Sequence, residues 1–144
     1  MVLIMSISKN VELMIKGSQG YSGDDMKNFE MFIVGTLKKL KDRWIISYAN
    51  ENNGLTQIVV LGKKTVIVKA NGDINYYLRL SESKNTKATF KSNGLFSYMS
   101  TYTSRIDTEM TKSNKYIELC YDLKIDSENV MKNELYISVG LLNN

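Results

Sequence analysis

The sequence predicts an all-β fold: an antiparallel up-and-down meander of about eight to ten strands closed into a barrel. Short segments alternate between apolar and polar residues with a period of two, which is typical of half-buried strands. Gly, Asn, Asp and Ser separate these segments, as they do in tight turns. No stretch longer than one turn has the apolar spacing of a helix, and "SGDDMKNFE" is the only weak candidate. The crossover helices that a parallel sheet needs are therefore missing.

The expected strands can be placed in order along the chain from this alternation. They cover residues 11–17, 29–40, 44–48, 55–61, 65–70, 74–80, 86–92, 95–111, 116–125 and 134–142. Alternate residues of a strand point to opposite faces, so the pattern also predicts which side chains are buried. The side chains expected to point inward are those of Ile46, Val59, Val68, Leu78 and Leu119, and those expected to point outward are Lys69, Arg79 and Lys124.

Tight turns account for the gaps between several strands. Asn53-Gly54, Asn71-Gly72 and Asn93-Gly94 each pair two residues that tolerate positive φ, which suits a hairpin. Consecutive hairpins give a meander, and closing it into a barrel removes exposed strand edges, although a sandwich stays open as an alternative. Glycines inside strands, at Gly17, Gly35 and Gly140, are typical of strongly bent barrel strands.

Composition limits the chemistry that the chain can perform. With 144 residues and 43% hydrophobic residues, a single domain over residues 1–144 is expected. The chain has no histidine and one cysteine, Cys120, so it lacks the common metal ligands, an internal disulfide and the usual general base. We expect no metal, no cofactor and no enzymatic activity, because the carboxylate pairs lie in turns or on a solvent-facing strand.

The start of the sequence bears on localisation. "MVLIMSISKN" has a short apolar stretch, no leading positive charge and no small-residue cleavage site, so it is a poor signal peptide and too short to span a bilayer. A cytoplasmic protein without membrane contact is expected. Both Met1 and Met5 are sensible starts, and with the first of them residues 2–7 would extend the first strand.

A family resemblance covers nearly the whole chain. The segments that carry it are "FEMFIVGTLKKL", "RWIISYANENNGLT", "TVIVKANGD", "LFSYMSTYT" and "KNELYISV". Their order resembles the YwiB-like family of bacterial proteins, a domain of unknown function with a calycin-type, lipocalin-like β-barrel. On that comparison Ala70, Ser100 and Thr103 stand where the family has arginine, threonine and glycine. The resemblance implies a calycin-like barrel and no established activity.

Polar and aromatic residues near the expected barrel mouth form the candidate ligand-binding site. Tyrosine supplies both a ring and a hydroxyl, the mixture that small-molecule pockets favour. Glu51 adjoins a hairpin turn, although turn chemistry alone also accounts for it, and Arg79 could bind an anion or simply face solvent. The candidates are Tyr48, Glu51, Tyr76, Arg79, Tyr98 and Ser100.

The net charge of +4 raises the question of nucleic acid as a partner. Lysines gather at two expected hairpin tips, at Lys38 and Lys39 and at Lys63 and Lys64, but no solvent-facing row of aromatic residues can be identified from spacing. We therefore do not expect nucleic acid as a partner, and the oligomeric state stays open. The sequence favours a binding module for a small hydrophobic or amphipathic ligand in the barrel interior. The alternative is a non-enzymatic interaction or structural protein, RNA- or protein-associated, whose barrel its own side chains fill.

Overall fold

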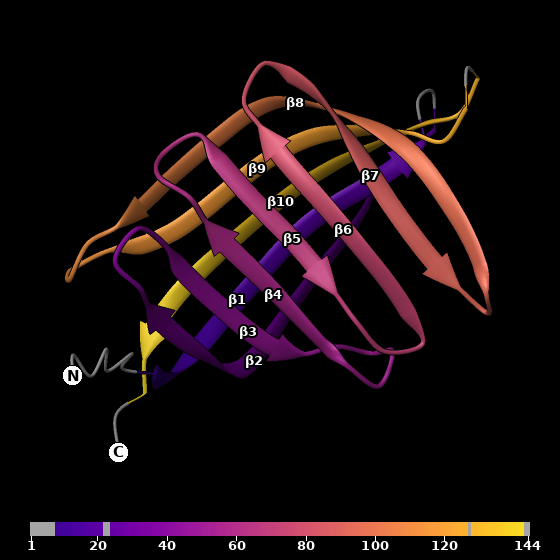
Figure 1. The fold of residues 1–144 in the computed structure, drawn as a ribbon. Coiled ribbons are helices and arrows are strands. Elements are labelled where there is room, and N and C mark those ends of the chain that lie inside the picture. Colours follow the sequence, from indigo (N-terminus) through magenta and orange to yellow (C-terminus); the bar gives the residue numbers. More distant parts are fainter. Residues whose placement is uncertain (1–7, 22–23, 127, 143–144) are drawn as a thin grey trace.

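The computed structural model describes residues 8–21, 24–126 and 128–142, and it is an antiparallel barrel (Figure 1). Each strand pairs with its neighbour in sequence, and β1 also pairs with β10, which closes the barrel. The possible extension of the first strand through residues 2–7 lies outside the described residues. The strands are β1 (Ser8–Tyr21), β2 (Lys27–Lys39), β3 (Trp44–Ala49), β4 (Leu55–Val60), β5 (Thr65–Ala70), β6 (Ile74–Ser81), β7 (Lys84–Ser92), β8 (Leu95–Met110), β9 (Lys115–Lys124) and β10 (Val130–Leu141).

The predicted all-β barrel is confirmed, and so are the hairpin turns. Asn53 and Asn93 have positive φ, as do Gly72 and Gly94, at the turns where the sequence places them. The weak helical candidate begins in residues outside the described part, and its second half forms the start of β2. In the described residues no helix is long and apolar enough to cross a membrane.

Two glycines permit close contacts between neighbouring strands. A Cβ on Gly35 of β2 would collide with the carbonyl oxygen of Ser47 on β3 and lie 2.8 Å from Leu13 Cδ1. A Cβ on Gly17 would overlap the ring of Phe29, its partner across β1 and β2. Gly140 is different, since its nearest neighbour would lie 3.8 Å away. Gly17 and Gly35 therefore have close neighbours that exclude a side chain, whereas Gly140 has space for one.

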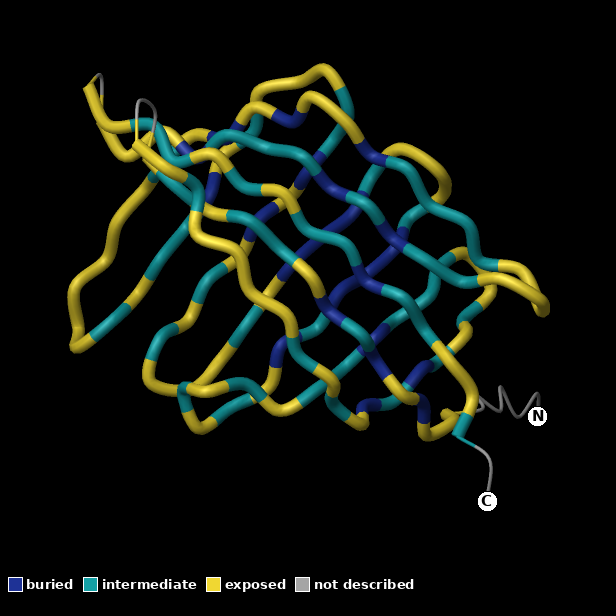
Figure 2. The backbone as a smooth tube through the Cα atoms, turned by 180° about the vertical axis from the view of Figure 1, so that it is seen from behind, coloured by how far each residue is buried: buried dark blue, intermediate teal, exposed yellow. Residues whose placement is uncertain are grey.

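The fully buried core occupies one half of the barrel interior, toward the ends where β1 begins and β10 finishes. Figure 2 shows the buried positions along the middle of the strands and the exposed positions at the turns. Burying these aliphatic side chains is the main source of stability for such a fold. Residues with essentially no exposed surface include Val11, Leu13, Ile46, Val66, Leu80, Ile106, Ile117, Leu119 and Ile137.

Most of the predicted strand faces are confirmed. Ile46, Val68, Leu78 and Leu119 are buried, and Lys69, Arg79 and Lys124 are exposed.

The prediction for Val59 is wrong about the face. Val59 is buried, but Ile46 of β3 pairs with Ile58, which belongs to the core, so Val59 lies on the outer side opposite Ile67. The cause is local: β4 and β5 are apolar on both faces, so alternation cannot decide which residue of a run such as Ile58-Val59-Val60 points inward.

A charged cluster links two turns and a strand at one end of the barrel, where the turns after β2, β4, β6 and β8 lie. We call this end the closed end. Lys64 Nζ lies 3.2 Å from Glu82 Oε2 and donates to the carbonyl oxygen of Ile106 at 3.1 Å. The Ile106 amide donates to the same Glu82 oxygen at 2.8 Å, and this hydrogen bond, with the one from Lys64, lowers the pKa of the Glu82 carboxyl. The turn after β4, the turn after β6 and strand β8 are thereby linked.

Candidate functional site

The other half of the barrel interior contains a cavity of about 460 Å³. Its walls are mainly aromatic and aliphatic side chains near the strand ends that meet the loops between β1 and β2, β3 and β4, β5 and β6, β7 and β8, and β9 and β10. Because antiparallel neighbours place these loops at one end, the cavity lies toward that mouth of the barrel. The inward-facing lining includes Ile15, Met31, Tyr48, Ile58, Val68, Tyr76, Leu78, Phe90, Met99, Tyr121, Leu123 and Met131.

Tyrosine hydroxyls are the main polar groups deep in this cavity. Burial raises the pKa of Tyr48 to about 12, helped by the nearby Tyr76 and opposed by a hydrogen bond with the Thr56 side chain. Burial likewise raises the pKa of Tyr76, and a hydrogen bond with Thr56 again opposes the rise. For Tyr121 burial raises the pKa further, and both other tyrosines add to the effect. These hydroxyls are therefore uncharged near neutral pH and can donate and accept hydrogen bonds.

Strand alternation explains how these side chains come together. Tyr48 of β3 and Thr56 of β4 are directly paired and point inward with the core residues Ile46 and Ile58. Tyr76 of β6 faces Phe90 of β7, with ring centroids 5.6 Å apart. The sequence pattern identified Tyr48 and Tyr76, but it missed Thr56 because the phase of β4 was assigned to the other face.

Glu51 lies in the turn between β3 and β4, exposed and away from the cavity. The polar side chains around Glu51, in residues 50–54, form hydrogen bonds that hold the turn itself. The Asn50 side-chain oxygen accepts hydrogen bonds from the amides of Asn52 at 2.9 Å and Gly54 at 3.1 Å. The Asn71 side chain accepts from the Leu55 amide at 2.8 Å, which joins this turn to the next hairpin. Residues 50–54 are therefore explained as turn structure.

Arg79, Tyr98 and Ser100 do not line the interior. All three are exposed on the outer face, and Tyr98 keeps 71% of its surface accessible. The assignment of Tyr98 and Ser100 to an interior site is corrected by β8, in which Met99, Thr101 and Thr103 point inward. Arg79 lies on the outward face of β6, as the alternation predicts, so it does not belong to the interior site. The sequence could not decide this phase, because aromatic residues occupy the outward positions of β8 and threonines the inward ones.

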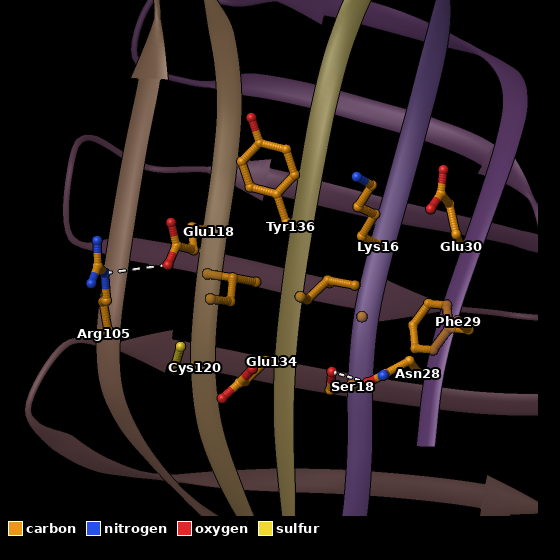
Figure 3. Close-up of a pocket in the computed structure, with 13 residues that line it drawn as sticks. Lys16, Ser18, Asn28, Phe29, Glu30, Arg105, Glu118, Cys120, Glu134 and Tyr136 are labelled. Atoms are coloured by element: carbon orange, nitrogen blue, oxygen red, sulfur yellow. Dashed lines mark hydrogen bonds and ion pairs between the residues drawn. The ribbon is translucent and has the colours of Figure 1, made fainter. Parts of the chain in front are cut away.

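A second hollow lies on the outer face of β1, β2, β8, β9 and β10 and has a volume of about 860 Å³ (Figure 3). Its charged groups include both signs: Arg105 Nε lies 3.5 Å from Glu118 Oε1, while Glu134 lies on β10 and Glu30 on β2. Burial raises the pKa of the Cys120 thiol in this hollow, and Glu134 and Glu118 add to the rise. The thiolate is disfavoured, so Cys120 is a poor nucleophile here.

The lysines of two hairpin tips meet at the closed end of the barrel. Lys39, Lys63 and Lys64 border one groove there, of about 720 Å³, with Asp107 and Glu109 also on its walls. Lys39 Nζ lies 4.9 Å from the centre of the Trp44 ring. In the described residues no group of His, Cys, Asp and Glu side chains is arranged to hold a metal ion.

The fold and its interior define a class: small closed antiparallel β-barrels in which side chains fill one half of the interior and a tyrosine-lined cavity occupies the other. The chain belongs to the family described as a domain of unknown function (DUF1934), whose sequence model matches residues 13–137. Among solved structures the chain is similar to the ywiB protein from Bacillus subtilis, with a TM-score of 0.77 and 16% sequence identity. That similarity covers 92% of this chain and 93% of the other, and it concerns the fold. Among curated proteins no sequence matches the chain.

Proposed function

We propose that the protein is a non-enzymatic, cytoplasmic binding module that holds a small, uncharged, hydrophobic or amphipathic ligand in its barrel, in the manner of a calycin. The observation that carries the proposal is the interior cavity of about 460 Å³. Small-molecule sites commonly enclose about 300–1,000 Å³ and combine apolar walls with a few polar groups.

The cavity chemistry supports an amphipathic ligand. Met31, Met99 and Met131 contribute flexible, polarizable walls that adapt to irregular apolar shapes. The hydroxyls of Tyr48 and Tyr76 offer a polar end near Thr56. A ligand with an apolar body and one hydroxyl, amide or carbonyl group would satisfy both parts.

The charge of the lining argues against an anionic ligand. Glu134 is the one charged residue among the lining residues described, and no lysine or arginine contributes to the wall. A carboxylate or phosphate buried there would lose its hydration without gaining a cation, which is costly. We therefore include the absence of net charge in the proposed ligand class.

A cytoplasmic, non-catalytic role is part of the same proposal. The single cysteine, Cys120, leaves no internal disulfide, as is common in reducing compartments. Its raised thiol pKa, and the tyrosines that stay protonated near neutral pH, give the described sites no activated nucleophile or base of the usual kinds.

Binding of the neutral fluorescent probe phenylnaphthylamine tests the proposal. We expect the full chain to bind it and to bind the anionic probe anilinonaphthalene sulfonate much more weakly. Val68→Phe extends a ring from the cavity wall and should abolish binding of the neutral probe, whereas Ile67→Phe, on the opposite face of β5, should leave it unchanged. Tyr48→Phe keeps the ring and removes only the hydroxyl, so it should retain the apolar probe.

Several outcomes would contradict the interior site. The proposal fails if wild-type protein does not bind the neutral probe, or if Val68→Phe folds and binds it as tightly as wild type. If Val68→Phe does not fold, Met99→Phe provides the same test from the wall formed by β8. Circular dichroism of each variant shows whether the barrel is intact.

A further inference from the structure

Four aromatic side chains lie exposed on the outer face of β6 and β8. The accessible fractions are 41% for Tyr77, 55% for Phe96, 71% for Tyr98 and 36% for Tyr102. Phe96 and Tyr98 touch edge to face, with ring centroids 4.9 Å apart. We call this surface, with the cations described next, the aromatic face. Exposed apolar groups that gather in this way commonly mark an interaction site.

The strand register places cations among these rings. Lys91 of β7 is paired with Phe96, and Lys69 of β5 is paired with Tyr77. Ser100 of β8 has a lysine on each side, Lys87 of β7 and Lys124 of β9. Arg79 follows Tyr77 on the outward side of β6 and is exposed.

Acidic residues are scarce on this surface. The sequence from Lys84 to Ser104 contains no Asp or Glu. In the described part of the chain, no carboxylate forms an ion pair with the five cations Lys69, Arg79, Lys87, Lys91 and Lys124. Asp122 of β9 is paired with Tyr102 at the border of this surface, and Asp126, just after β9, lines the depression described next. The outer hollow around Arg105 is different, because there the cation is already paired with Glu118.

A depression of about 450 Å³ connects the two kinds of group. Its walls include Tyr98, Ser100, Lys87 and Lys124, together with one carboxylate, that of Asp126. A phosphate placed beside Ser100 could accept a hydrogen bond from its hydroxyl and contact both ammonium groups. The next outward residue along β8 is Tyr98, about 7 Å away along the strand, and its ring is free to stack on a base.

We infer that the aromatic face binds single-stranded nucleic acid, with bases stacked on Phe96, Tyr98 and Tyr77 and phosphates held by the surrounding lysines. Exposed rings alone would fit many partners. Cations without an ion-pair partner among the described residues favour a polyanion, and the rings beside them favour one that carries flat bases, which is nucleic acid. A duplex keeps its bases stacked on one another, so the rings would have nothing to receive. Residue spacing along the sequence did not predict nucleic acid as a partner, because the rings and the lysines come from different strands and only the register brings them together.

Fluorescence anisotropy with labelled single strands of about 12 nucleotides tests the inference. The probes are oligouridylate RNA, oligothymidylate DNA and a duplex of matching length. We expect the full chain to bind both single strands more tightly than the duplex, and the ratio of RNA to DNA affinity shows whether the 2′-hydroxyl is recognised. Tyr98→Ala should weaken binding by about tenfold, since one stacked base is lost.

Matched variants elsewhere on the barrel provide the controls. Phe32→Ala removes a ring that is 75% exposed on β2, and it should leave binding unchanged. Lys87→Glu and Lys91→Glu should each weaken binding and reduce the slope of log affinity against log salt by about one. Lys16→Glu makes the same charge change on β1 and should have a much smaller effect.

The inference is overturned if neither single strand binds at low salt, or if the duplex binds as tightly as the single strands. It is also overturned if Phe32→Ala and Lys16→Glu weaken binding as much as their counterparts do, because general electrostatic attraction would then suffice. Binding to vesicles of anionic lipid in place of either oligonucleotide would assign the face to a membrane surface instead. Val68→Phe should leave oligonucleotide binding intact, so the outer and interior sites can fail separately.

Discussion

The side chain of Thr103 on β8 is buried opposite Tyr121 on β9, and its hydroxyl has no hydrogen-bond partner among the described residues. Thr101, two residues earlier on the same strand, is equally buried, but its hydroxyl is hydrogen-bonded to that of Thr86. The register between β8 and β9 shifts just after Thr103, between Thr103 and Arg105, as at a β-bulge. The two threonines therefore share burial and differ in hydrogen bonding.

Replacing Thr103 with valine should stabilise the protein. A buried hydroxyl without a partner costs about 1–3 kcal/mol, and valine removes it while keeping the shape. We expect Thr103→Val to raise the free energy of unfolding by about 1 kcal/mol in urea denaturation. Thr101→Val should lower it by a similar amount, because the Thr86 hydroxyl loses its partner. Equal losses in both variants would show that the Thr103 hydroxyl has a partner in solution.

Adjacent residues of β6 should respond very differently to substitution. Leu78 is buried in the core, so Leu78→Asp places an unpaired carboxylate there and should unfold the barrel, a loss of several kcal/mol. Arg79 is exposed, and Arg79→Ala should leave the melting temperature within a few degrees of wild type. Thermal denaturation followed by circular dichroism measures both. A large loss of stability in the arginine variant would mean that Arg79 supports the fold from the outer face.

Alanine substitution at two strand glycines, Gly35 and Gly140, should have different effects on the free energy of unfolding. Gly35→Ala introduces a Cβ that would collide with the Ser47 carbonyl oxygen, so we expect a loss of about 1–3 kcal/mol in the free energy of unfolding. Gly140→Ala meets no such obstacle and should be neutral or slightly stabilising, since alanine restricts the unfolded chain. Urea denaturation of the two variants side by side measures the difference, and similar losses would refute the close approach of β2 and β3.

The sequence predicted which residues of β6 and β9 point inward, because a charged residue in each strand identifies the solvent-facing side. In β6, Arg79 separates Leu78 from Leu80, and in β9 Glu118 separates Ile117 from Leu119; in both strands the predicted inward residues are buried. β4 lacks such a marker, and its phase was assigned incorrectly. In β4 the inward position nearest the cavity mouth is Thr56, a residue that alternation alone would place outside.

The candidate site was predictable only in part for a related reason. Tyr76 was placed inward because Ile74 and Leu78 share its phase, and Tyr48 because Trp44 and Ile46 do. For Tyr98 neither phase of β8 is consistently apolar, so its direction depends on pairing with β7 and β9, which spacing does not reveal. The aromatic face depends on the same cross-strand register.

Alkaline pH should destabilise the barrel through Tyr48. Its pKa rises from the ordinary value near 10 to about 12 on folding, so the unfolded chain loses this proton first. The stability that Tyr48 contributes is complete below about pH 10 and is lost as the pH rises toward 12. Urea denaturation across this range should show a smaller loss in Tyr48→Phe than in wild type. Identical losses would mean that the hydroxyl is solvated in the folded protein.

Native mass spectrometry of the full chain, purified without denaturation from cells that express it, tests the central claim most directly. We expect a population carrying a small neutral molecule that is released on unfolding and is missing from Val68→Phe, because a ring at that position enters the cavity of about 460 Å³. Ile67→Phe serves as the control and should retain the molecule. Wild-type protein that carries no such molecule and also binds no neutral apolar probe would contradict the claim that the barrel interior is a ligand site.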